Sequence, residues 1–404
     1  MTTMHTVPTS NVAVTENAKT KHSTKVVIYL STLGRGGAQR VAANLANDLY
    51  VQGYDVCIVC LHTERPDDYE LNPHIKRVSL NKLTPRQHWY SGITANYQRW
   101  LAVRRALVEE SPDVVISLLT SSNVLSILAC IGTSIPVIVS ERTYPPRSNV
   151  SLPWKFLRVA LYRLVNNVVV QSEKSKRWLI DNFVAKRISI IPNTVYWPPS
   201  TFPSKVEPPS ARGSERKKLL AVGRLVPQKG FNYLLEAYAS LAVKYPDWDL
   251  YIIGVGDQSR LQKDINDRGL QDRVQLVGQV GNLVDWYEAA DLFVLSSVFE
   301  GFPNCLAEAM AAGLPVASFD CPTGPSDLIQ HEVNGLLVEP ENSDELLLAL
   351  ERLIDDESLR QRLGTAAKDV VIRYSAKNTV SLWEALISQA CDKRAPATDF
   401  DKAR

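Results

Sequence analysis

The sequence predicts an α/β protein in which two doubly wound, Rossmann-like domains face each other across a cleft. Short apolar runs alternate with helical segments along most of the chain, and this alternation indicates βαβ units and parallel sheets. It is interrupted at residues 196–215, where a stretch rich in Pro and Ser is typical of a linker. At 404 residues, the chain is long enough for two ordinary domains.

The first domain is expected at residues 25–196, with a helix at about residues 38–50 after its first strand. Residues 1–24 are polar and lack the apolar core of a secretory signal, so we expect a disordered tail there. The strands expected in this domain lie at residues 26–31, 55–61, 113–119, 136–140, 167–172 and 188–192.

The second domain is expected at residues 216–376, after the linker at 197–215. Ligands of doubly wound sheets bind at the C-terminal ends of the strands, so residues that follow a strand are the candidates for a site. The strands expected here lie at residues 218–223, 249–254, 274–278, 291–297, 315–320 and 335–340.

Charge is distributed unevenly along the chain. The net charge is only +2, but residues 1–200 contain 23 Lys and Arg and 13 Asp and Glu, a net of +10, which leaves −8 for the remainder. A basic first half favours an anionic partner, such as a phospholipid surface or a pyrophosphate-linked acceptor. Ordinary solvated surface charge explains the excess equally well.

The expected compartment is the cytoplasm, because no apolar run reaches the ~18–20 residues that span a bilayer. Residues 154–165 interleave bulky apolar side chains with Lys155, Arg158 and Arg163. This pattern fits a helix in peripheral contact with an anionic membrane, on the cytoplasmic face of the plasma or inner membrane. It fits equally a core helix with a solvated basic face. A nucleic-acid partner is not expected.

The stretch EGFPNCLAE, residues 300–308, predicts half of a nucleotide-diphosphate site. Glu300 directly follows an apolar strand, and Pro303 can open the next helix because its missing N–H is not needed there. The helix N-terminus offers free N–H groups to a phosphate. Glu308, about a turn and a half further on, can accept hydrogen bonds from a ribose diol. The neighbouring residues expected to line this site are Phe302, Pro303, Asn304, Cys305 and Leu306.

EGFPNCLAEAM resembles the glutamate-pair motif of retaining glycosyltransferases of family 4, which have the GT-B fold. The resemblance covers roughly residues 25–375. It implies transfer of a hexose or N-acetylhexosamine from a UDP-sugar, with retention, to a glycan or lipid-linked glycan in cell-surface polysaccharide or glycolipid synthesis. It also implies that a last helix, about residues 377–392, crosses back onto the first domain, and that no metal or cofactor is needed.

Arg224 and Lys229 follow the strand at 218–223 and suit a diphosphate, since one offers an arginine fork and the other a point charge. In the resembled family an Arg and a Lys at this spacing hold the donor pyrophosphate and stabilise the leaving group. Glu300 would then position the donor sugar, so these three are the expected catalytic residues. Both cations are expected to face solvent in the open cleft. The alternative is that they are ordinary loop charges.

Glycine-rich loops add weaker signals. Gly36 and Gly37 immediately precede the first helix, and in the resembled family this loop lies near the donor phosphate and the acceptor. Gly324 belongs to a loop that resembles the family's donor-sugar loop, although Pro325 replaces its second glycine. Val280 and Leu283 stand where family members contact the nucleobase.

The acceptor side is predicted from strand ends of the first domain. Glu141 and Arg142 follow the strand at 136–140, and Asn193 follows the strand at 188–192, where turn structure is the competing explanation. Many family members carry a histidine after a first-domain strand, but residues 117–126 contain none. Asn123 or Thr120 is expected to stand in for it, or another residue does that work.

Two other functions share the same motifs. A UDP-sugar epimerase of GT-B-like fold would use the same diphosphate site, and a non-catalytic nucleotide-sugar binding module would keep Glu308. Product analysis separates the three, because a transferase forms a new glycoside, an epimerase isomerises the donor, and a binding module turns nothing over. The donor sugar, the acceptor, the linkage and the oligomeric state are left open by the sequence.

Overall fold

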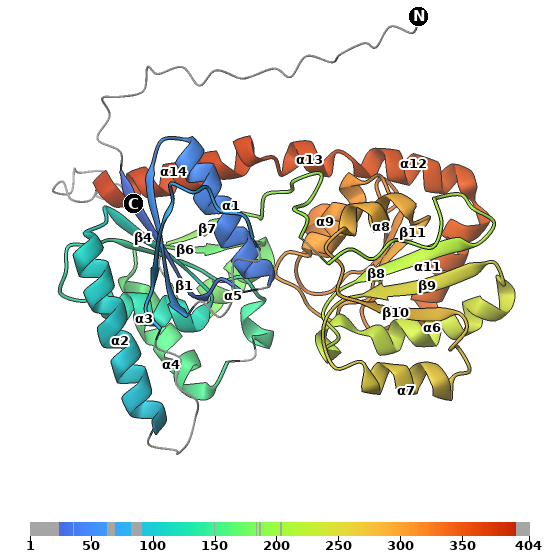
Figure 1. Ribbon diagram of the computed structural model, residues 1–404, viewed down its shortest axis with the longest axis horizontal. Helices are drawn as coiled ribbons and strands as arrows, with labels where there is room; N and C mark the ends of the chain where they lie inside the picture. The colour runs from blue at the N-terminus through green and yellow to red at the C-terminus, as the bar shows by residue number, and fades with distance from the viewer. Residues whose placement is uncertain are drawn as a thin grey trace, which may run out of the picture.

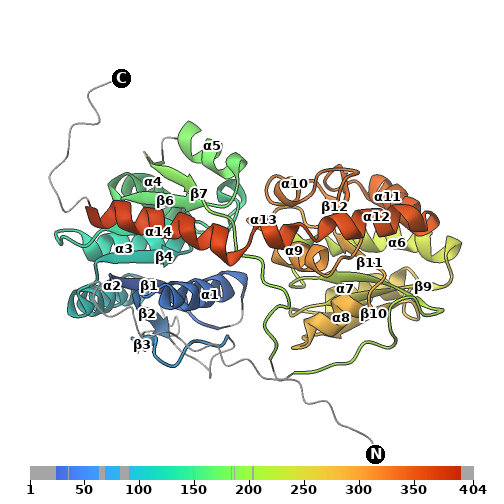
Figure 2. The same cartoon turned by 90° about the horizontal axis from the view of Figure 1, so that it is seen from above.

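The computed structural model describes residues 24–34, 36–62, 69–81, 91–148, 150–182, 184–185, 187–202 and 204–392. These residues form two parallel sheets side by side, each with helices on both faces (Figures 1 and 2). The predicted fold class, α/β with two doubly wound domains, is confirmed. The expected tail lies outside the described residues except for Thr24.

The first sheet has the strand order β3-β2-β1-β4-β5-β6-β7 and is parallel throughout. All six predicted strands are present. The seventh strand, β3, was not predicted, because it is an exposed edge strand and its sequence KRVS has no apolar run. The strands are β1 Lys25–Thr32, β2 Asp55–His62, β3 Lys76–Ser79, β4 Val114–Leu118, β5 Val137–Ser140, β6 Asn167–Val170 and β7 Ile188–Ile190.

The two faces of this sheet are covered by different helices. Val26, Ile28 and Leu30 of β1 pack on one side, while Val27 and Tyr29 pack on the other, as the alternation of a strand requires. Helices α1 (Gly37–Val51) and α14 (Ala376–Asp392) cover the first face. The second face is covered by α2 (Ser91–Glu110), α3 (Thr120–Cys130), α4 (Leu152–Leu161) and α5 (Glu173–Asp181), with short 3-10 turns at η1 (Pro145–Arg147) and η2 (Tyr162–Leu164).

The C-terminal helix joins the two halves of the molecule. α12 (Glu357–Ala367) and α13 (Val370–Arg373) pack on the second domain, and the chain then crosses so that α14 lies on the first (Figures 1 and 2). Trp383 and Ile387 of α14 are buried in the first domain's core. A segment that follows the second domain in sequence therefore completes the core of the first.

The second sheet is parallel and has the order β10-β9-β8-β11-β12-β13. Its six strands all correspond to predicted ones. They are β8 Lys217–Val222, β9 Trp248–Ile253, β10 Val274–Gly278, β11 Leu292–Leu295, β12 Val316–Phe319 and β13 Leu336–Val338.

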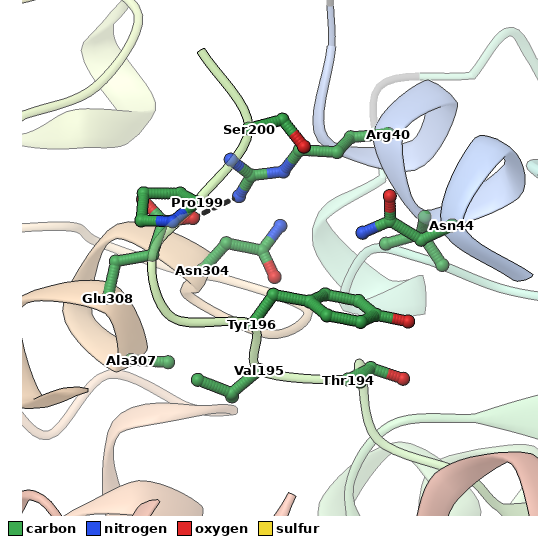
Figure 3. A pocket seen from close by; sticks show the side chains of 11 residues that line it. Arg40, Asn44, Thr194, Val195, Tyr196, Pro199, Ser200, Asn304, Ala307 and Glu308 are labelled. Atoms are coloured by element: carbon green, nitrogen blue, oxygen red, sulfur yellow. Dashed lines mark hydrogen bonds and ion pairs between the residues drawn. The ribbon is translucent and has the colours of Figure 1, made fainter. Parts of the chain in front are cut away.

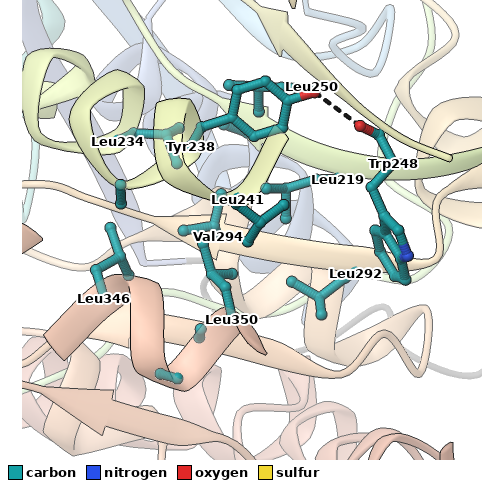
Figure 4. Close-up of a cluster of buried hydrophobic side chains, with 14 of the residues drawn as sticks. Leu219, Leu234, Tyr238, Leu241, Trp248, Leu250, Leu292, Val294, Leu346 and Leu350 are labelled. Atoms are coloured by element: carbon teal, nitrogen blue, oxygen red, sulfur yellow. Dashed lines mark hydrogen bonds between the residues drawn. The ribbon is translucent and has the colours of Figure 1, made fainter. Parts of the chain in front are cut away.

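One face of the second sheet carries a large apolar cluster in which Leu234, Tyr238 and Leu346 meet the strands (Figure 4). The helices on this face are α6 (Phe231–Lys244), α7 (Ser259–Asp267) and α11 (Ser343–Asp355). The other face is covered mainly by α8 (Leu283–Ala289) and α9 (Asn304–Ala311), and the smaller elements are η3 (Pro227–Lys229) and α10 (Pro325–Leu328).

The order of strands reverses at β1/β4 in the first sheet and at β8/β11 in the second. Such switch points open a crevice at the C-terminal edge of a sheet, where ligands bind. Residues lining the large cleft follow β1 and β4 to β7 on one side and β8 to β11 on the other. The two C-terminal edges therefore border a single cleft between the domains.

The expected linker forms neither helix nor strand in its described residues, 196–202 and 204–215. It is bound along the second domain, where the Trp286 indole donates to the Val206 carbonyl at 2.7 Å and Arg212 donates to the Tyr287 carbonyl at 2.9 Å. Ser200 and Phe202 reach the cleft between the domains.

Candidate active site

The cleft between the domains has a volume of about 520 Å³. This is within the range of about 300–1,000 Å³ that is usual for ligand pockets. Most of the residues predicted from the sequence line it. They are Gly36, Gly37, Arg142, Asn193, Arg224, Lys229, Val280, Leu283, Glu300, Phe302, Asn304, Cys305 and Glu308.

Lys229 and Glu300 form an ion pair on the second-domain side of the cleft. They follow the neighbouring strands β8 and β11, and the Lys229 Nζ donates to the Glu300 Oε1 at 2.6 Å. The Lys229 side chain is 12% exposed and that of Glu300 is 8% exposed, which corrects the expectation that Lys229 faces open solvent. Burial lowers the pKa of Lys229, but the charge and hydrogen bond of Glu300 outweigh it and raise the pKa.

Arg224 is the second cation of this group, and its side chain is exposed as expected. It lines the cleft and lies near enough to Lys229 for its positive charge to act on the pKa of that lysine in the lowering direction. Since Lys229 is held by Glu300, Arg224 is the more accessible cation of the two for an incoming anion.

Glu308 is buried on α9 and both of its oxygens have partners. The Arg40 guanidinium pairs with Oε1, and the Tyr287 hydroxyl donates to Oε2 at 3.0 Å. Arg40 belongs to α1 of the first domain, so this pair bridges the two domains beside a small pocket (Figure 3). Burial raises the pKa of Tyr287 well above its usual value, and the Glu308 charge adds to the effect.

Arg40 and Tyr287 were not predicted from the sequence as residues of the site. Arg40 stands at the end of the motif LGRGGAQR, one helical turn after Gly36 and Gly37, so its position in the first turn of α1 was the available signal. Tyr287 lies inside α8 with no motif around it. Its proximity to Glu308 depends on how α8 and α9 pack side by side.

The N-terminus of α9 faces the cleft, with Asn304 in its first turn. The Asn193 amide donates to the Asn304 Oδ1 at 2.8 Å across the domain boundary. Gly37 of the first domain faces the same asparagine, since a Cβ there would be in ordinary van der Waals contact with the Asn304 Nδ2 at 3.4 Å. The Leu306 side chain is fully buried in the second domain's core, and only its backbone belongs to the first turn of the helix.

Gly324 lies behind Glu300 and does not line the cleft. Its φ is +101°, and a Cβ there would sit 2.5 Å from the Pro303 Cδ and 3.5 Å from the Glu300 Cβ. The neighbouring Thr323 hydroxyl donates to the Glu300 carbonyl. Gly324 and Pro303 thus form a buried support for Glu300, because the close approach leaves no room for a side chain.

Glu141 and Asn123 lie beneath the cleft, and the expectation that they contact an acceptor is corrected by their burial. The Glu141 carboxylate accepts hydrogen bonds from the Thr120 and Tyr162 hydroxyls. The fully buried Asn123 amide donates to the Ser140 carbonyl at 3.0 Å and to the Tyr162 Oη at 2.9 Å. These groups are satisfied internally, so they hold α3 against the end of β5.

The nucleobase end predicted at Val280 and Leu283 borders the cleft together with the linker. The backbone of Gly281 is packed against the linker, since a Cβ there would meet the Phe202 carbonyl oxygen at 1.9 Å. From the sequence, the linker was predicted only as a connection between the domains. Its part in the cleft arises from tertiary contacts, because the stretch has no periodic pattern.

Helix α4 differs from both sequence interpretations. Arg158 is buried, and its guanidinium lies 5.1 Å from the centre of the Trp178 ring. Phe156 is 73% exposed, Leu152 is exposed as well, and so is Leu164 in the following turn η2. The outward face is therefore apolar, with Arg163 at its end. None of the helices in the described part of the chain has the length and apolar character that a membrane span requires.

Two arginine side chains hold the carboxylate of Asp249 in β9. The Arg216 Nε donates to the Asp249 Oδ2 at 2.6 Å, and the Arg273 Nε donates to its Oδ1 at 2.9 Å. Within the described ranges, no group of three or more His, Cys, Asp and Glu side chains is arranged to hold a metal ion.

Comparison with known proteins covers both domains. Residues 205–370 match the family described as Glycosyl transferases group 1, and residues 35–196 match Glycosyltransferase Family 4. An uncharacterized glycosyltransferase of Haemophilus influenzae is 28% identical to this chain over 90% of the chain and 99% of its own length.

A second relative is an α-1,4-N-acetyl-D-galactosaminyltransferase of Campylobacter jejuni. Its name gives the acceptor as GalNAc-α-(1→4)-GalNAc-α-(1→3)-diNAcBac-PP-undecaprenol. It is 28% identical over 90% of this chain and 98% of its own length. Among solved structures, HepE of Anabaena in complex with UDP and glucose superposes with a TM-score of 0.72, at 18% identity, over 90% of this chain and 99% of HepE.

Proposed function

Since this chain belongs to the GT-B glycosyltransferases of the family 4 type, we propose that it uses a UDP-sugar as donor. It transfers a hexose or N-acetylhexosamine, with retention of the anomeric configuration, to a glycan or lipid-linked glycan. The observation that carries the proposal is the placing of Glu300, Lys229, Arg224 and Glu308 around one interdomain cleft.

The donor is oriented by α9. The ribose diol of the donor donates hydrogen bonds to Glu308, whose carboxylate is already fixed by Arg40 and Tyr287. The diphosphate lies at the N-terminus of the same helix, where unpaired N–H groups and the positive end of the helix dipole favour an anion. The base extends toward Val280, Leu283 and the linker.

The chemical step requires stabilisation of the departing diphosphate. Arg224 is accessible for this purpose, and Lys229 is positioned by its 2.6 Å contact with Glu300. Positively charged hydrogen-bond donors that are already held in position stabilise a developing negative charge more strongly than water does. Glu300 orients the donor sugar and keeps Lys229 in place, and closure of the two domains excludes water, which would otherwise compete as the acceptor.

The acceptor lies on the first-domain side and approaches from a membrane surface. The Campylobacter relative, whose printed acceptor is linked to undecaprenol, supports a lipid-linked glycan. The exposed apolar face of α4 supports peripheral contact with the membrane, and the net charge of +10 in residues 1–200 favours an anionic surface. The compartment that fits both is the cytoplasmic face of the membrane.

The proposal is tested by incubating purified protein with a panel of UDP- and GDP-sugars and measuring donor hydrolysis, followed by product analysis with a glycolipid acceptor. We expect turnover of at least one UDP-sugar and a product whose anomeric configuration, measured by NMR, equals that of the donor. An isomerised donor would indicate an epimerase instead. Nucleotide binding without any turnover would indicate a binding module.

A further inference from the structure

Arg142 is a buried cation that borders the cleft and has hydrogen-bond donors without a partner. It follows β5 at the C-terminal edge of the first sheet, is 7% exposed and lines the cleft. Its Nη1 donates to the Asn193 Oδ1 at 2.8 Å. Its Nε and Nη2 have no hydrogen-bond partner among the residues that the structure describes.

The positive charge of Arg142 also lacks a counter-ion within the described ranges. Besides Asn193, the guanidinium faces the Trp383 ring, whose centre lies 5.7 Å from the guanidinium carbon. Burial lowers the pKa of Arg142 to about 9. Burying a charge without an opposite charge is costly, and attraction to an aromatic face returns only part of that cost. An anion bound at this point removes the imbalance.

The surroundings hold this guanidinium in a fixed orientation. Gln171 donates to the same Asn193 Oδ1 at 2.7 Å, and Asn193 in turn donates to Asn304 of α9. The Arg142 carbonyl packs against Gly301, where a Cβ would lie 2.2 Å from it. The Arg142 backbone therefore lies against Gly301, the residue after Glu300, which orients the donor sugar under the proposed function.

The two unused donors belong to the same side of one guanidinium, and in this structure the surrounding side chains shield both from solvent. Nε and Nη2 form one edge of the guanidinium, and this edge binds the two oxygens of a carboxylate or phosphate at once. The donor diphosphate already has Arg224, Lys229 and the α9 N-terminus on the second domain. Arg142, on the first domain, is left for a different anionic group.

We propose that Arg142 binds a second oxyanion at the sugar end of the cleft, a phosphate or carboxylate carried by the acceptor or by the donor sugar. This inference rests on the proposed function, because it assumes that the diphosphate of the donor occupies the second-domain side. Neutral sugars alone would leave the charge of Arg142 unpaired. The expected substrate therefore carries an anionic group besides the donor diphosphate.

The first experiment uses inorganic phosphate as the probe. Thermal unfolding is measured with saturating UDP, which fills the diphosphate site, in sodium phosphate and in sodium chloride of equal ionic strength. We expect phosphate to raise the Tm of the wild type, and Arg142→Gln to weaken the phosphate affinity derived from the titration by about tenfold or more, the scale for one charged hydrogen bond. Arg142→Lys keeps the charge without the fork and should fall between the two.

Arg158→Gln is the matched control. Arg158 is a buried arginine of the same domain that also faces a tryptophan ring, but it does not line the cleft. We expect it to lower the Tm while leaving the response to phosphate intact. If phosphate stabilises Arg142→Gln as much as the wild type, Arg142 is a structural residue and the proposal is overturned.

Calorimetry with nucleotides separates this proposal from the proposed function and identifies the source of the anion. UDP alone should bind wild type and Arg142→Gln within about twofold of each other, since Arg142 is assigned to a different group. A tenfold loss of UDP affinity would place Arg142 in the diphosphate site and overturn the inference. If UDP does not bind the wild type at all, the proposed donor site fails, and the phosphate titration is repeated without UDP.

The same calorimetry with UDP-glucuronate and UDP-glucose distinguishes the two sources. A preference for UDP-glucuronate that disappears in Arg142→Gln places the anion on the donor sugar. Equal affinities, together with an Arg142-dependent phosphate response, place it on the acceptor. Either result supports an oxyanion site at Arg142.

Discussion

Replacing Lys229 and Arg224 separately by alanine should give two different outcomes, although both remove one positive charge from the cleft. Lys229 is 12% exposed and donates to the Glu300 Oε1 at 2.6 Å, whereas Arg224 is exposed. Lys229→Ala leaves a buried carboxylate without its partner. Arg224→Ala removes a side chain that stands in the open cleft.

Both variants should lower kcat/KM by about 10²-fold or more, the scale for losing one fixed charge donor to the transition state. Their stabilities should differ. Breaking a buried ion pair by removing one partner costs about 3–5 kcal/mol of unfolding free energy, and the lower end applies here because the pair borders a cleft. Arg224→Ala should change the unfolding free energy by no more than about 0.5 kcal/mol, as is usual for an exposed position.

Stability is measured without ligand by urea unfolding, and turnover with the UDP-sugar that the donor screen identifies. Adding Glu300→Gln to Lys229→Ala should restore part of the lost stability, because the unpaired charge is then gone. The stability difference should stay constant from pH 7 to 9, since a lysine whose pKa is raised from 10.5 loses its contribution only as the pH rises through the higher value. Unchanged stability and near-normal turnover of Lys229→Ala would refute the reasoning.

Three further predictions follow from single positions. Glu308→Gln should weaken UDP binding by about 1.5–3 kcal/mol in calorimetry, the value of a charged hydrogen bond, and unchanged affinity would remove Glu308 from the donor site. Gly324→Ala should lower the Tm and donor turnover more than Gly269→Ala does, because both have positive φ but only Gly324 is closely packed; equal effects would contradict its role behind Glu300. Phe156→Ser should reduce co-sedimentation with anionic vesicles at low salt and leave donor hydrolysis intact. Val243→Ser, at another highly exposed apolar position, on α6, should change neither vesicle binding nor donor hydrolysis. Vesicle binding unaffected by Phe156→Ser would exclude α4 as the contact.

The sequence alone determined the architecture to a large degree. Strands such as β1 and β11 are buried on both faces, so they appear as continuous apolar runs that can be recognised without a structure. The same pattern placed Glu300 and Lys229 after strands at one edge of the sheet, because parallel strands end at the same edge, whereas the pairing of β8 with β11 came from the structure. The exposed edge strand β3 was not predicted, since its charged sequence contains no such apolar run.

Tertiary structure decided which of these residues have partners and which of them face the cleft. Arg40 reaches Glu308 from the other domain, 268 positions away in sequence, and no local pattern encodes that contact. Asn123 and Arg158 are polar in sequence but are buried by the packing of α3 and α4. The direction of a side chain after a strand end or on a polar helix is set by the neighbouring elements. Periodicity therefore fixes the elements and the edge that carries the site, while packing between domains fixes the contacts within it.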